Sequence, residues 1–218
     1  MNAIVRTTNA SDDLTGWITP SRTAVLIIDM QVDFASPQGA LGGFIDMSVV
    51  EPALAAAQAL AASARAAGVP VVFVGLSTTP ETDSPAWNER MRRRGGDPDT
   101  DAALCRAGQV GSDFYGPKPS PGEIVVAKTR YSGFVGTDLD VQLTKLGVDT
   151  LVVAGLTTEC CVDSTVRDAF DLDYHVFVAA DACAAYEADI HEASLKVMEL
   201  NSAILTTTDD VAAAWSAK

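Results

Sequence analysis

One stretch decides the fold of this chain: Ala154-Gly155-Leu156-Thr157-Thr158-Glu159-Cys160-Cys161-Val162. A short β-branched apolar run, residues 150–154, leads into it and predicts a buried strand. Beyond it, apolar side chains recur between Val162 and Phe170 at the spacing of a helix with one buried face. The pattern therefore predicts a strand, a glycine turn and a helix, with Thr158 as the N-cap residue of the helix.

The predicted helix begins next to a pair of cysteines, Cys160 and Cys161. Unpaired N–H groups and the positive end of the helix dipole stabilise an anion in the first turn of a helix. We therefore expect the Cys161 thiol to tend toward the thiolate. The alternative interpretation is that both cysteines are small core residues, as many free cysteines are.

The bulk composition favours one globular domain that acts on a small molecule. The chain has 218 residues, which favours a single domain at residues 23–218 after a polar N-terminal arm of residues 1–22. We expect this arm to lie on the surface or on a neighbouring subunit. A formal net charge of −14 argues against nucleic acid or an anionic membrane surface as the partner.

The sequence also indicates where the protein is located and whether its cysteines are reduced. The N-terminus lacks the apolar centre of a signal peptide, and there is no uninterrupted run of about 18 apolar residues. The four cysteines have neither metal-type nor disulfide-type spacing. We therefore expect a cytoplasmic protein with reduced thiols.

Six apolar runs alternate with helical segments along the chain. The runs cover residues 23–28, 69–74, 123–127, 150–154, 175–179 and 203–206. This alternation predicts an α/β fold of three layers, with a six-stranded, mostly parallel, Rossmann-like sheet between two layers of helices. Residues 76–120 interrupt the rhythm with prolines, glycines and an arginine cluster. They predict a long excursion, with a short helix near Trp87, that helps to select the substrate.

Three reactive side chains follow the ends of predicted strands. Asp29 follows the first strand, Lys128 the third, and Cys161 the turn after the fourth. Ligands of parallel α/β sheets bind at the carboxyl ends of the strands, so these groups could share one crevice. Each residue alone has an ordinary structural explanation as a turn, surface or core residue, but together they favour a site.

A thiol nucleophile needs a base, a compensating cation and donors for the developing oxyanion. The two histidines, His175 at a strand start and His191 on a late helix, do not lie next to Cys161 in the predicted order of elements. We therefore assign Asp29 as the base and Lys128 as the cation. Backbone N–H groups of the turn, for instance those of Thr157 and Cys161, would bind the oxyanion. This set fits hydrolysis of an amide or a related bond.

Three ordered motifs resemble the isochorismatase-like superfamily of cysteine hydrolases over residues 23–211. They are Leu26-Ile27-Ile28-Asp29-Met30-Gln31-Val32-Asp33-Phe34, Lys128-Thr129-Arg130-Tyr131-Ser132-Gly133-Phe134, and Gly155-Leu156-Thr157-Thr158-Glu159-Cys160-Cys161-Val162. The resemblance implies the α/β/α fold and a catalytic triad of Asp29, Lys128 and Cys161.

The resemblance also assigns the turn in detail. The superfamily nucleophile stands directly before a valine, which selects Cys161 and leaves Cys160 as a packing residue. The bond before Thr157 is expected to be cis, which turns the Thr157 N–H toward the oxyanion beside the Cys161 N–H. The resemblance further implies a homodimer or homotetramer.

Three subtypes of the superfamily compete. Nicotinamidases bind a metal through histidines in the segment after the second strand, but residues 76–120 contain no histidine, so we expect no metal and no cofactor. True isochorismatases cleave a vinyl ether without a nucleophilic cysteine, whereas this chain has Cys161. Amidohydrolases of ureido or carbamoyl compounds fit best, through a thioester intermediate and release of ammonia or an amine.

The expected pocket residues are Gln31, Phe34, Trp87 and Tyr131, although the aromatic side chains could equally be core residues. Two other classes of function stay open. A non-catalytic binding protein on the same fold would show no turnover. A nucleotide-binding protein is disfavoured, because the chain has neither a Gly-x-Gly-x-x-Gly turn nor a Walker-type loop.

Overall fold

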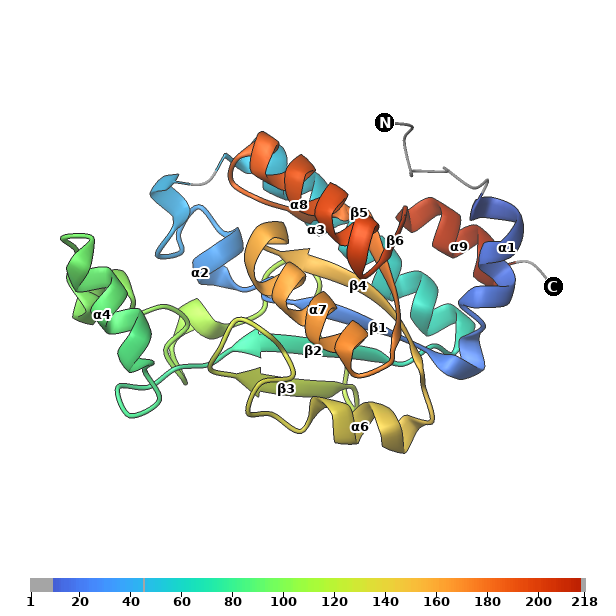
Figure 1. Ribbon diagram of the computed structural model, residues 1–218, viewed down its shortest axis with the longest axis horizontal. Helices are drawn as coiled ribbons and strands as arrows, with labels where there is room; N and C mark the ends of the chain where they lie inside the picture. The colour runs from blue at the N-terminus through green and yellow to red at the C-terminus, as the bar shows by residue number, and fades with distance from the viewer. Residues whose placement is uncertain (1–9, 45, 217–218) are drawn as a thin grey trace.

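The computed structural model describes residues 10–44 and 46–216 and contains one sheet of six strands (Figure 1). All strand pairs are parallel, and their order is β3-β2-β1-β4-β5-β6. The strands are β1 (Thr23–Ile28), β2 (Val71–Leu76), β3 (Ile124–Lys128), β4 (Thr150–Leu156), β5 (His175–Ala184) and β6 (Ile204–Thr206). The predicted fold class is confirmed.

Helices cover both faces of the sheet. One face carries α1 (Ala10–Trp17), α3 (Met47–Ala67) and α9 (Thr208–Ser216), and the other carries α6 (Leu139–Leu146), α7 (Asp163–Asp171) and α8 (Ala188–Asn201). Strand β1 contributes alternately to the two cores, with Val25 and Ile27 on the α3 side and Leu26 and Ile28 on the α7 side. Because both faces are covered, the central strands have continuous apolar sequences instead of alternating ones.

Helix α3 runs along one face of the sheet. The Asp46 carboxylate caps its first turn by accepting from the Ser48 N–H, and Gly68 ends it with φ of 73°. By length and composition alone, α3 could cross a membrane. The core helix of a globular protein can have the same length and composition. Its buried residues pack in the core beneath the sheet; they are Val50, Ala53, Leu54, Ala57, Leu60, Ala61 and Ala64.

The N-terminal segment is not the surface arm that was predicted. Residues 10–17 form α1, and Leu14 and Ile18 are buried in the same core as α9. The Trp215 indole N–H of α9 donates to the Ile18 carbonyl at 2.7 Å. The prediction failed because Leu14 on α1 and Ile18 just beyond its end are both buried, although the segment around them is mostly polar. Residues 1–9 of the predicted arm lie outside the described residues.

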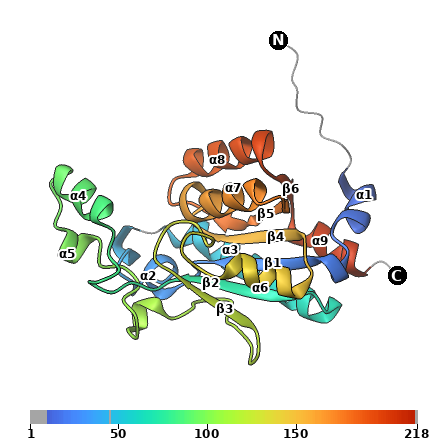
Figure 2. The same ribbon diagram turned by 60° about the horizontal axis from the view of Figure 1, so that its bottom comes forward.

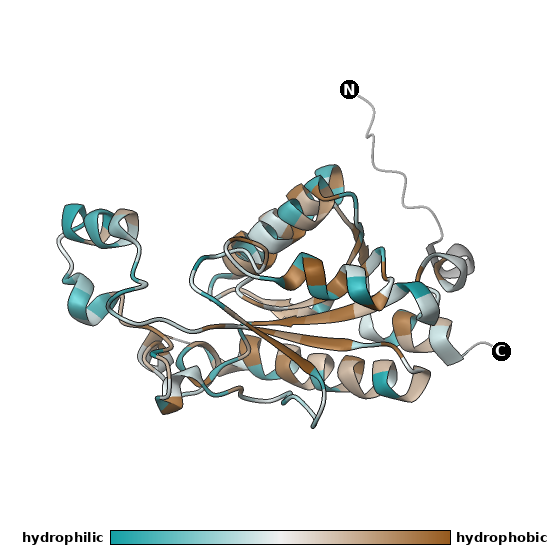
Figure 3. Cartoon of the chain, turned by 90° about the horizontal axis from the view of Figure 1, so that it is seen from below, coloured by the Kyte–Doolittle hydropathy of each residue, from teal (hydrophilic) through white to brown (hydrophobic). Residues whose placement is uncertain are grey.

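The long excursion after β2 stands off from the sheet at the carboxyl ends of the strands (Figure 2). Residues 77–106 form it and include the helices α4 (Pro85–Arg93) and α5 (Pro98–Asp101). Both helices are mostly hydrophilic, in contrast to the apolar strands (Figure 3). Shorter elements near the same end of the sheet are α2 (Val32–Ala35), η2 (Gly42–Phe44) and η3 (Val110–Ser112), while η1 (Pro20–Arg22) precedes β1.

Gly155 sets a close approach between the two central strands. It has φ of 151°, and a Cβ atom there would clash with the Ile28 carbonyl oxygen. We expect Gly155→Ala to lower the free energy of unfolding by about 3 kcal/mol or more, because it combines an unfavourable backbone conformation with overpacking. Urea unfolding measures the loss.

The matched control for this variant is Gly43→Ala, where a Cβ atom would meet nothing within 4 Å. That substitution should change the free energy of unfolding by less than about 1 kcal/mol. Equal stability of the two variants would contradict the close packing of β1 on β4.

Candidate active site

Asp29, Lys128 and Cys161 come together at the carboxyl ends of the strands. The Lys128 ammonium lies 2.7 Å from an Asp29 carboxylate oxygen and donates to the Cys161 sulfur at 3.5 Å. Its third bond goes to the Arg130 carbonyl at 2.9 Å. Asp29 and Lys128 are fully buried, and Cys161 is 8% exposed. Two hydrogen bonds and one ion pair therefore hold the ammonium, and the Asp29 oxygen of that pair accepts no hydrogen bond from the described residues.

The Asp29 carboxylate is oriented by the end of β2. Its second oxygen accepts from the Leu76 N–H at 2.9 Å, and the Asp29 N–H donates to the Val74 carbonyl at 2.8 Å. Asp29 has φ of 48°, a left-handed conformation that aspartate adopts more readily than most residues. The chain therefore leaves β1 sharply at Asp29 and turns its carboxylate toward Lys128.

The thiol stands on a wide, π-type turn, η4 (Thr158–Val162), which runs directly into α7. The Thr165 hydroxyl donates to the Cys161 carbonyl at 2.6 Å and accepts from the Gly133 N–H at 3.0 Å. Thr165 thus joins the turn to the loop after β3, which also follows Lys128. The peptide bond between Leu156 and Thr157 is cis.

Thr158 is not the N-cap that was predicted. Its buried hydroxyl lies 2.8 Å from Nδ1 of His191 on α8, and the residue that precedes the turn is Thr157. The prediction failed because the turn is wider than an α-helix and directs Thr158 toward α8 instead of toward its own N–H groups. His191 therefore supports the turn that carries the thiol through Thr158.

The expected thiolate is also wrong for the free protein. A hydrogen bond with Cys160, burial and the negative charge of Asp29 raise the pKa of the Cys161 thiol well above its usual value, against the opposing effect of Lys128. Burial would lower the pKa of Lys128, but the negative charge of Asp29 and the contact with the Cys161 sulfur outweigh it and raise that pKa. Burial and the Asp29 carboxylate thus oppose ionisation of the Cys161 thiol, while Lys128 favours it.

A raised thiol pKa predicts a distinctive pH dependence of alkylation. The rate at which iodoacetamide modifies Cys161 should rise about tenfold per pH unit between pH 7 and 9, because only the thiolate reacts. It should not level off near the usual thiol pKa of about 8.5. Tandem mass spectrometry, which separates the modified forms of Cys160 and Cys161, measures the rate. A plateau below pH 8 would contradict the raised pKa.

A pocket of about 200 Å³ opens onto Cys161. Three of the expected pocket residues, Phe34, Trp87 and Tyr131, line it, and the Trp87 and Tyr131 rings lie with centroids 5.0 Å apart. The excursion and the turn with the residues just before it contribute most of the other lining residues, which are Leu41, Leu76, Arg90, Met91, Asp101, Ala102, Leu104, Leu156, Thr157, Glu159, Cys160 and Tyr186.

Gln31 does not line this pocket, in contrast to the prediction. Its side-chain amide donates to the Leu76 and Ser112 carbonyls at 2.9 and 2.8 Å, and its oxygen accepts from the Leu76 N–H at 2.8 Å. Gln31 is 2% exposed, so its polar atoms are used to join β2 to the segment before Phe114. It acts as a structural link behind the site.

Cys160 packs partly buried against the core on the α7 side, as expected, and it also lines the pocket beside Cys161. The prediction assumed the rotation of about 100° per residue of an α-helix. The π-type turn has more residues per turn, so neighbouring side chains diverge less. Sequence alone gives no clear signal for such a turn.

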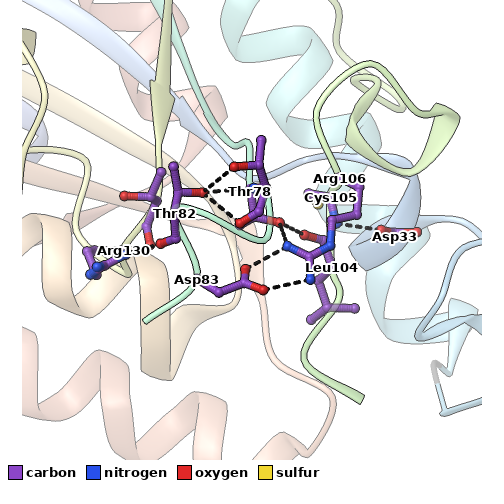
Figure 4. A network of polar contacts seen from close by, with 10 residues as sticks. Asp33, Thr78, Thr82, Asp83, Leu104, Cys105, Arg106 and Arg130 are labelled. Carbon is purple, nitrogen blue, oxygen red and sulfur yellow. Dashed lines mark hydrogen bonds and ion pairs between the residues drawn. The ribbon is translucent and has the colours of Figure 1, made fainter. Parts of the chain in front are cut away.

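Polar contacts hold the base of the excursion against the site (Figure 4). The Arg106 guanidinium binds both Asp83 oxygens, at 2.6 and 2.8 Å, and donates to the Thr78 hydroxyl at 3.2 Å. Arg130, two residues after Lys128, donates to the Thr82 carbonyl at 3.1 Å. The two ends of the excursion are therefore joined to each other and to the loop beside the buried cation.

Comparisons with known proteins agree with this architecture. The isochorismatase domain family matches residues 23–210. Ureidoacrylate amidohydrolase RutB of Pseudomonas savastanoi pv. phaseolicola is 35% identical over 90% of this chain and 85% of its own length. The RutB of Pantoea ananatis is 38% identical over 75% of this chain and 70% of its own length.

Solved structures give the same result. A cysteine hydrolase from Pseudomonas syringae pv. phaseolicola superposes with a TM-score of 0.79 and 30% identity, over 92% of this chain and 95% of that chain. N-carbamoylsarcosine amidase from Thermoplasma acidophilum has a TM-score of 0.67 and 28% identity, over 86% and 97% of the two chains.

Proposed function

This chain belongs to the isochorismatase family, and from that premise we propose that it hydrolyses a carbon–nitrogen bond in a small amide, ureido or carbamoyl compound through Cys161. One observation carries the proposal: a buried ion pair of Asp29 and Lys128 touches a thiol at the wall of a pocket. A binding protein would have no use for a thiol at a pocket wall beside a buried charge pair, because such a pair is costly to bury.

In the proposed reaction Asp29 is the base, because a thiol whose pKa is raised needs a group to take its proton. Asp29 takes the Cys161 proton as the sulfur attacks the carbonyl carbon, and the N–H groups of Thr157 and Cys161 bind the oxyanion. The leaving ammonia or amine takes that proton as the carbon–nitrogen bond breaks. Asp29 then activates water, which cleaves the thioester and returns a proton to the sulfur.

Lys128 supports both steps by its position. Its ammonium binds Asp29 and Cys161 at once, so it stabilises the negative charge on whichever of them carries it.

Neither histidine is a better base. His175 begins β5, at the opposite edge of the sheet from the pocket, and His191 is bonded to Thr158. Aspartate is therefore the base that the geometry favours.

The substrate class follows from the relatives together with the pocket. Two of the similar proteins are named as acting on ureidoacrylate and N-carbamoylsarcosine. Both compounds contain a urea-type N–CO–NH₂ group. A pocket of about 200 Å³ with aromatic walls suits a small planar group of this kind. We therefore rank ureido and carbamoyl compounds above nicotinamide and above vinyl ethers.

A screen of ammonia release tests the proposal. The wild-type protein is offered 3-ureidopropionate, N-carbamoylglycine, propionamide and nicotinamide, and rapid-quench mass spectrometry follows any covalent adduct on Cys161. Turnover of a ureido or carbamoyl compound with a transient adduct is the expected result. Binding without turnover of any of the four would favour the non-catalytic alternative, and preferential turnover of nicotinamide would favour the nicotinamidase alternative.

We also propose that the protein is a homodimer or homotetramer in the cytoplasm, as the sequence resemblance implied. Light scattering at several protein concentrations measures the subunit number.

A further inference from the structure

Helix α8 is held by few contacts with its own chain. Of its 14 residues only Met198 is buried, and the helix lies at the top of the folded body in Figure 2. It nevertheless supports the candidate site, because His191 on α8 contacts the Thr158 hydroxyl at 2.8 Å in the turn that carries Cys161. Helices in proteins are stabilised mainly by packing of their apolar faces. We therefore looked for a second packing surface on α8.

The exposed side of α8 carries an apolar stripe, which consists of Ile190, Ala193, Val197 and Leu200. These residues follow one another at intervals of three, four and three, so they lie on one face of the helix. The exposed fractions are 38% for Ile190, 41% for Val197 and 52% for Leu200, and Ala193 is exposed as well. A contiguous exposed apolar face marks a surface that binds another molecule.

The charged residues of α8 lie outside the stripe. They are Asp189, Glu192, Lys196 and Glu199. At about 100° per residue, the stripe falls between this charged flank and the flank that carries Met198. At its end the stripe continues onto α7, because Leu200 and the exposed side chain of Phe170 line one surface hollow of about 540 Å³. The stripe is thus an apolar seam with a charged rim on one side.

The spacing of the stripe fits a second copy of the same helix. Intervals of three, four and three read the same in both directions along the chain. Two antiparallel α8 helices related by a twofold axis would place Ile190 on the partner's Leu200 and Ala193 on the partner's Val197, and each contact would occur twice. A net charge of −14 makes two copies repel, so they need a contact surface without charges, which the stripe provides.

We propose that a second copy of this chain packs its α8 antiparallel against α8, through the stripe, about a twofold axis. This interface rests on the homo-oligomer proposed above, not on turnover, and adds where the subunits meet. Each subunit covers the exposed side of the other's α8. The contact therefore holds the helix that carries His191 against the turn with the thiol.

The first test places a charge in the stripe. We expect Val197→Glu to halve the number of subunits found for the wild type and to raise the dissociation constant of this contact about 100-fold or more, because two unpaired carboxylates would enter an apolar seam. Light scattering and sedimentation velocity at several concentrations measure both quantities, and circular dichroism checks the fold. Leu200→Glu, at the most exposed position of the stripe, should give the same result.

The matched control is Ala188→Glu, which adds an equal charge at an exposed position of α8 outside the stripe. It should keep the subunit number of the wild type. A wild type that stays monomeric would leave the stripe to a different kind of partner and would overturn both the homo-oligomer and this interface. A wild-type oligomer that persists in Val197→Glu and Leu200→Glu overturns this interface alone, as does equal dissociation of Ala188→Glu.

The second test determines the direction of the two helices. Ala193→Cys protein is mixed with Val197→Cys protein, left to exchange subunits and mildly oxidised. We expect a disulfide between positions 193 and 197 of different subunits as the main new product, identified by mass spectrometry of the cross-linked peptides. Ala188→Cys mixed with Val197→Cys should not form the corresponding bond. An oligomer that gives no 193–197 bond, or as much of the control bond, overturns the antiparallel arrangement.

Discussion

Cys161→Ala is expected to lose at least about 10³-fold in kcat on any substrate that the wild type turns over, with no covalent adduct. Alanine removes the sulfur that would attack the carbonyl, while Asp29 and Lys128 keep their ion pair. The fold should persist, because Cys161 is a small residue at the pocket wall. Ammonia release measures the rate, and circular dichroism checks the fold.

Cys160→Ala is the matched control, because it removes a thiol from the neighbouring position of the same turn. Cys160 has no contact with Lys128 among the described hydrogen bonds, whereas Cys161 has one at 3.5 Å. We expect Cys160→Ala to keep its activity to within about tenfold of wild type. If Cys160→Ala is inactive and Cys161→Ala is active, the nucleophile is Cys160.

Lys128→Met is expected to lower both stability and activity. The substitution leaves the Asp29 carboxylate buried without its cation, which costs about 3 to 5 kcal/mol in the free energy of unfolding when a buried pair is broken in this way. The kcat should fall by about 10²-fold or more, because the charge that holds the base and the thiol together is gone. Urea unfolding and ammonia release measure the two effects.

The double variant Asp29→Asn with Lys128→Met separates stability from catalysis. Removing both charges should restore much of the stability that Lys128→Met loses, since a buried pair can be replaced at little net cost. Activity should not return, because the base is also absent. A double variant that is as unstable as Lys128→Met would show that the loss came from packing of the lysine chain instead of from the unpaired carboxylate.

The stability that the charged Lys128 contributes depends on pH, and the direction of its pKa shift sets this dependence. The folded-state pKa is raised, so this contribution is fully present below the unfolded value of about 10.4 and is lost as the pH rises through the folded value. The stability difference between wild type and Lys128→Met that comes from the lysine should therefore stay constant from pH 7 to 9.

The strands and three site residues could be predicted from sequence because each has a local signal. Continuous apolar runs mark strands covered on both faces, and parallel strands bring their carboxyl ends to one edge. Asp29, Lys128 and Cys161 each stand just beyond such a run, and the structure brings all three into contact.

Other features depend on contacts that sequence spacing does not reveal. The π-type turn cannot be distinguished from an α-helix by apolar periodicity, so Thr158 was assigned a wrong direction and the place of Cys160 on the pocket wall was missed. Gln31 follows a strand end as a site residue would, but its side-chain amide is hydrogen-bonded to backbone atoms of Leu76 and Ser112. Arg90 belongs to an arginine cluster that reads as a solvated helix end, and only the path of the excursion brings one member to the pocket.

The joint formed by Arg106 and Asp83 has a consequence for how such a protein can diversify. The three reactive groups stand on the sheet or directly beyond it, whereas Trp87, Arg90 and Met91 belong to a segment that leaves and re-enters the body beside that joint. Replacement of the intervening residues alters the shape and charge offered to a visiting molecule without disturbing the buried ion pair. The residues that carry out the reaction and the residues that select the substrate therefore lie on separate parts of the chain, which can change independently.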